Sequence, residues 1–103
     1  YEALAESRDA ALAAIAAKGL KEAAYHLRYS GGWLVRLGDG TPESHARVER
    51  ALGVLWPFTN ELFVDDETDR AVAEAGIGVL PSSLQAAWSA RVDETLARAM
   101  LAR

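Results

Sequence analysis

Hydrophobic residues recur with helical spacing along most of the chain. From about residue 10 to residue 37, apolar or small side chains fall on one stripe at 100° per residue, and basic side chains lie opposite. The members of this stripe are Leu12, Ile15, Ala16, Gly19, Leu20, Ala23, Leu27 and Leu34. The pattern predicts a long amphipathic helix that begins after Asp9, the better N-cap, with Ser7 as the alternative. Gly19 and the run Ser30-Gly31-Gly32 weaken this helix, so a bend or break is expected at the run.

The clearest boundary along the chain is the segment from Gly38 to Pro42. Gly38 is expected to adopt the left-handed conformation that ends a helix. Thr41 is a good N-cap, and Pro42 suits the first position of the next helix because its missing N–H is not needed there. These signals predict a helical hairpin with a tight loop. The second helix has one mixed face, formed by His45, Val48, Glu49, Leu52, Leu55, Trp56, Thr59 and Phe63.

Proline and capping residues divide the rest of the chain. Pro57 lacks a donor and clashes one turn back, so we expect a kink near Trp56 and the end of the helix by Leu62 or Phe63. The run Asp65-Asp66-Glu67 predicts a short helix that ends at Gly76. The segment Pro81-Ser82-Ser83 starts a last helix with Leu84, Trp88, Val92, Leu96 and Ala99 on one face. With no alternating strand pattern, the fold class is all-α: a long helical hairpin plus two further helices.

Composition narrows the classes of protein that fit. The chain has 103 residues, is 50% hydrophobic and has a formal charge of −4, which favours a single helical domain over residues 1–103. The absence of Cys excludes disulfides and thiolate metal sites and fits a cytoplasmic protein. The acidic balance disfavours nucleic acid as a partner. No run of about 18 uncharged apolar residues is present, so no membrane span is expected.

Four polar residues on the two long helices are candidate metal ligands: Glu22, His26, His45 and Glu49. Di-iron sites in helical bundles use Glu-x-x-His pairs, whereas both pairs here have i, i+4 spacing. If the hairpin reflects about its loop, Glu22 and His45 lie about 18 Å apart along the bundle. The spacing therefore favours buried, hydrogen-bonded polar residues, and we predict a polar core network of Glu22, His26 and Glu49. No catalytic nucleophile or phosphate loop is recognisable.

Aromatic residues are concentrated between residues 25 and 63. Trp33 and Trp56 are expected to pack between helices, since a domain of this size needs few rings to fill its core. The alternative is that some of these aromatics form a contact surface for another protein, rimmed by arginines. The aromatics in question are Tyr25, Tyr29, Trp33, Trp56, Phe58 and Phe63, and the arginines are Arg28, Arg36, Arg47 and Arg50.

Several segments of the chain together are distinctive. They are residues 21–30 (KEAAYHLRYS), 33–41 (WLVRLGDGT), 55–59 (LWPFT), 61–63 (ELF), 76–79 (GIGV) and 84–88 (LQAAW). On these segments the chain resembles the PaaC family, the C subunits of the bacterial ring-1,2-phenylacetyl-CoA epoxidase, from about Tyr1 to Leu101. The resemblance implies a ferritin-like helical bundle and a part in phenylacetate catabolism within a monooxygenase complex. Family members are longer, so the chain is expected to be a fragment of such a protein.

The same resemblance implies a division of labour between subunits. A ferritin-like catalytic subunit holds the di-iron centre, a reductase with NADPH and flavin delivers electrons, and the PaaC-type subunit is a structural partner without its own metal or cofactor. At the Glu-x-x-His position of such oxygenases this chain has Glu22, but Tyr25 stands where the His would be. A tyrosine hydroxyl is protonated at neutral pH and is a poor replacement for imidazole. Glu22 is therefore interpreted as a vestigial ligand position.

The sequence thus predicts a non-catalytic subunit that binds and supports the catalytic subunit. Two alternatives stay open: a catalytic di-iron oxygenase subunit and a generic helical interaction module. Half a bundle leaves apolar stripes uncovered, so self-association of this chain is also expected.

Overall fold

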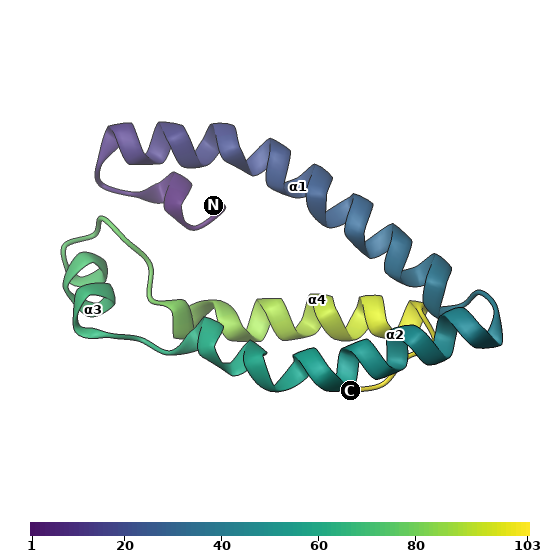
Figure 1. Cartoon of the computed structure of the whole chain (residues 1–103). Coiled ribbons are helices and arrows are strands. Elements are labelled where there is room, and N and C mark those ends of the chain that lie inside the picture. The colour runs from purple at the N-terminus through teal and green to yellow at the C-terminus, as the bar shows by residue number, and fades with distance from the viewer.

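Four α-helices and three shorter 3-10 segments make up the chain (Figure 1). The computed structural model describes residues 1–103 and contains no strand, which confirms the all-α prediction. None of the helices has the length and hydropathy needed to cross a membrane. In chain order the elements are η1 (Leu4–Glu6), α1 (Ala10–Gly38), α2 (Pro42–Leu55), η2 (Trp56–Phe63), α3 (Glu67–Glu74), η3 (Pro81–Leu84) and α4 (Gln85–Arg98).

Helix α1 is a single element of 29 residues. Its N-cap is Asp9, as predicted, and the Asp9 carboxylate accepts a hydrogen bond of 3.0 Å from the backbone N–H of Leu12. The expected break at Ser30-Gly31-Gly32 is absent. Glycine lowers helix propensity but keeps its backbone donor and acceptor, so the i to i−4 ladder continues. The Ser30 hydroxyl donates to the carbonyl of His26 at 2.8 Å, one turn back.

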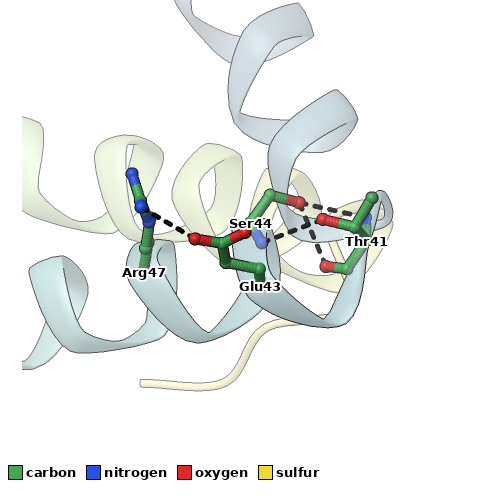
Figure 2. A network of polar contacts seen from close by, with 4 residues as sticks. All are labelled: Thr41, Glu43, Ser44 and Arg47. Carbon is green, nitrogen blue, oxygen red and sulfur yellow. Dashed lines mark hydrogen bonds and ion pairs between the residues drawn. The ribbon is translucent and has the colours of Figure 1, made fainter.

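The hairpin loop is closed by a capping box. The Thr41 hydroxyl accepts from the N–H of Ser44 at 3.1 Å, and the Ser44 hydroxyl accepts from the N–H of Thr41 at 3.0 Å (Figure 2). One turn into α2, the Arg47 guanidinium pairs with the Glu43 carboxylate at 2.7 Å (Figure 2). The predicted cap is therefore confirmed. The predicted left-handed conformation of Gly38 is wrong, because Gly76 is the glycine with positive φ.

Gly38 is glycine for a different reason, which is close packing. An added Cβ would lie 2.3 Å from the carbonyl oxygen of Ala99 and 2.8 Å from its Cβ, far inside van der Waals contact. Both Gly38 and Ala99 are buried. The end of α1 therefore crosses the end of α4 at a separation that only a residue without a side chain allows.

After residue 55, the helices begin and end close to the proline, aspartate and glycine residues that predicted their boundaries. Helix α2 ends at Leu55, and the chain continues as 3-10 helix through Pro57 to Phe63, as the proline predicts. Asp66 caps α3 through the N–H of Asp69 at 2.7 Å, and Gly76, with φ of 75°, lies just beyond the end of that helix. The last helix is preceded by a 3-10 turn at Pro81.

The hydrophobic core lies at one end of the molecule, where the end of α1 meets α2 and α4 (Figure 1). Leu96, Ala99 and Leu101 are its buried centre. The partly buried side chains packed against them are Leu34, Val35, Val48, Leu52, Trp56 and Val92. Away from this end α1 diverges from α2 and α4, and η1 lies beneath its first turns (Figure 1).

The divergence of α1 makes the molecule extended. Its Cα radius of gyration is 16.3 Å, compared with about 13 Å for a compact domain of about 100 residues. Five of the 103 residues are buried, and Ala16 is the buried residue in the first half of α1. The helices predicted by the sequence are therefore present, but most of their apolar faces are not covered.

Candidate functional site

The three residues predicted to form a polar core network are exposed. The His26 imidazole and the Glu22 carboxylate lie 3.7 Å apart on α1, with side chains 67% and 77% exposed. Glu49 is exposed on α2 and forms no hydrogen bond or ion pair. The expectation of a shared buried network is therefore wrong within this chain. The physical reason is the divergence of the hairpin, which separates residues 22–26 of α1 from α2 (Figure 1).

The polar residues do not form a metal-binding constellation in this chain. No group of three or more His, Asp or Glu side chains is close enough to hold a metal ion. His45 is engaged elsewhere, since its Nδ1 lies 2.7 Å from the carbonyl oxygen of Gly38 and joins α2 to the end of α1. Glu22 and His26 supply one carboxylate and one imidazole, without a third ligand.

Tyr25 belongs to an exposed aromatic group on α1. It is 54% exposed, and its ring centroid lies 6.1 Å from that of His26 and 6.2 Å from that of Tyr29. The Arg28 guanidinium lies 5.9 Å from the Tyr25 centroid. Tyr25 therefore lies on an exposed side of α1.

The two tryptophans predicted to pack between helices differ in environment. Trp56 confirms the prediction: it packs against the core, with its ring centroid 5.8 Å from that of Trp88. Phe63 approaches Trp88 edge-on at 5.1 Å. Trp33 contradicts the prediction, because it is 45% exposed and is covered by the Arg36 guanidinium at 5.2 Å. Its neighbours Leu34 and Val35 on α1 point to the core instead.

A group of exposed hydrophobic side chains lies on the outside of α2 and η2. Phe58 was named from the sequence as a possible contact residue, but this group as a whole was not predicted. Five large apolar side chains there are between 57% and 68% exposed. They are Val54, Leu55, Phe58, Leu62 and Val64, which we call the α2–η2 ridge. Leu55 and Phe58 are three residues apart at the start of the 3-10 segment, so these two side chains lie on the same side of it. The sequence pattern had instead placed Leu55 on the mixed face of the second helix with Leu52 and Trp56, whereas Leu55 is exposed in the structure.

A second apolar feature is a groove between α1 and α4. It has a volume of about 360 Å³ and includes Leu27, Leu34, Trp88 and Val92 in its lining. The groove lies beside the core, where α1 starts to diverge. Arg91 and Thr95 of α4 complete much of its rim.

The loop between η2 and α3 is joined to the start of η3. The Asp65 carboxylate accepts from the Ser82 hydroxyl at 2.5 Å and from the Ser82 N–H at 2.9 Å. These two hydrogen bonds stabilise the ionised form and lower the pKa of Asp65, and Arg70 lowers it further by its charge. This contact has a structural role, because it joins segments 17 residues apart.

Together these features define an all-α protein with an open arrangement of helices and large exposed apolar faces. The chain belongs to the family described as phenylacetic acid catabolic protein, whose sequence pattern matches residues 1–103. It is 55% identical over 92 residues to the protein of Escherichia coli (strain K12) named as the C subunit of 1,2-phenylacetyl-CoA epoxidase. The match covers 89% of this chain and 37% of that relative, so the chain spans well under half of the relative's length.

Proposed function

We propose that this chain is part of a non-catalytic, structural subunit of a phenylacetyl-CoA epoxidase complex in phenylacetate catabolism. The family and the 55% identity to the Escherichia coli epoxidase protein support the choice of complex. The observation that carries the structural role is the α2–η2 ridge. Exposed apolar surface of this kind marks an interaction site.

The proposed role is to bind and stabilise the di-iron catalytic subunit. A partner that binds only the folded form of another protein stabilises it by mass action. In this proposal the apolar side chains of the ridge are removed from water when the partner binds. Each Å² of apolar surface that is buried contributes about 25 cal/mol of favourable free energy. Phe58, which is 63% exposed at the centre of the ridge, is its natural anchor, since aromatic residues dominate interface energetics.

In this proposal the reaction chemistry belongs to the partner subunits, in the cytoplasm. The di-iron centre is assigned to the catalytic subunit, and NADPH and flavin are assigned to the reductase. Support comes from the arrangement around Glu22, where Tyr25 replaces an imidazole and no third ligand approaches. The uncovered apolar area also supports self-association of the chain.

The test is binding to a di-iron catalytic subunit of an epoxidase complex. Light scattering after gel filtration measures the mass of the mixture, and turnover of phenylacetyl-CoA measures activity. We expect a complex with the chain and weaker binding by the double variant Phe58→Asp/Leu62→Asp. Met100→Asp is the matched control, because Met100 is similarly exposed, at 67%, but lies beyond the end of α4 and outside the ridge.

Two results would overturn the proposal. The first is a catalytic subunit that is fully stable and active alone and forms no complex, which would favour a generic interaction module. The second is stoichiometric iron in the purified chain, which would favour a catalytic di-iron subunit.

A further inference from the structure

We draw no further inference here: the strongest candidate, the apolar groove between α1 and α4 with the exposed side chains of Arg28, Arg91 and Arg98 beside it, carries no proposal, because the chain spans 37% of its relative's length and nothing in the structure shows what covers this groove.

Discussion

Replacement of Gly38 by alanine tests how tightly α1 and α4 are packed at the core. In an open helix position, this change stabilises by up to about 1 kcal/mol, since alanine is the better helix former. At Gly38 the new Cβ would lie 2.3 Å from the Ala99 carbonyl oxygen, so the two helix ends must separate by about 1 Å to reach ordinary contact. The neighbouring atom is backbone and cannot rotate away.

The separation would disturb most of the buried core. Leu96, Ala99 and Leu101 are three of the five buried residues, and all belong to or follow α4. Overpacking of a core costs about 1–3 kcal/mol. With the propensity gain subtracted from the upper end of this range, we expect Gly38→Ala to lower the free energy of unfolding by about 2 kcal/mol.

Gly32→Ala is the matched control, because Gly32 lies in the same helix and an added Cβ would meet nothing within 4 Å. It should raise the free energy of unfolding by up to about 1 kcal/mol. Urea unfolding followed at 222 nm, at one fixed protein concentration, measures both variants. Equal stability of the two variants, or a more stable Gly38→Ala, would refute the close crossing of α1 and α4.

Three further variants test separate contacts. Thr41→Ala removes the capping box of α2 and should lower the free energy of unfolding, measured with urea, by about 1 kcal/mol. Thr41→Ser keeps a hydroxyl at this position and should retain most of the wild-type stability. Ser82→Ala removes the hydrogen bond from the hydroxyl, the largest cause of the lowered pKa of Asp65. When the pKa of a carboxyl is lower in the folded than in the unfolded protein, the ionised carboxyl stabilises the fold at a pH above the unfolded-state pKa. This stabilisation is lost as the pH falls through the folded-state pKa. The free energy of unfolding of the wild type should therefore fall more than that of Ser82→Ala below about pH 4. Trp88→Ala should lower the free energy of unfolding by about 2–4 kcal/mol, because it removes the ring that packs between Trp56 and Phe63. An unfolding midpoint close to that of the wild type would contradict the assignment of Trp88 to the core.

Local signals in the sequence predicted most element boundaries. Asp9, Thr41 and Asp66 cap the helices that they were expected to cap. Pro57 changes the helix type at the predicted place. These features depend on residues within one turn of each other, so no knowledge of the distant chain was needed.

The candidate site was predicted less well, because burial depends on distant parts of the chain. Periodicity placed Glu22 and His26 on or beside an apolar stripe, and a stripe was taken to mean a covered face. Trp33 was expected to be covered because a small domain needs few rings to fill its core. In the structure these residues are exposed, since α1 diverges from α2 beyond the core. Trp56 was predicted correctly because α4 returns alongside α2 and covers it.

The helices, their caps and the hairpin turn could be predicted from sequence patterns, because hydrogen bonds and side-chain conflicts within four residues define them. The packing of the helices was needed to learn which helix faces are covered, why position 38 excludes a side chain, and that much of α1 and the α2–η2 ridge is exposed. Those properties depend on distances between helices far apart in the chain, which helical periodicity does not contain.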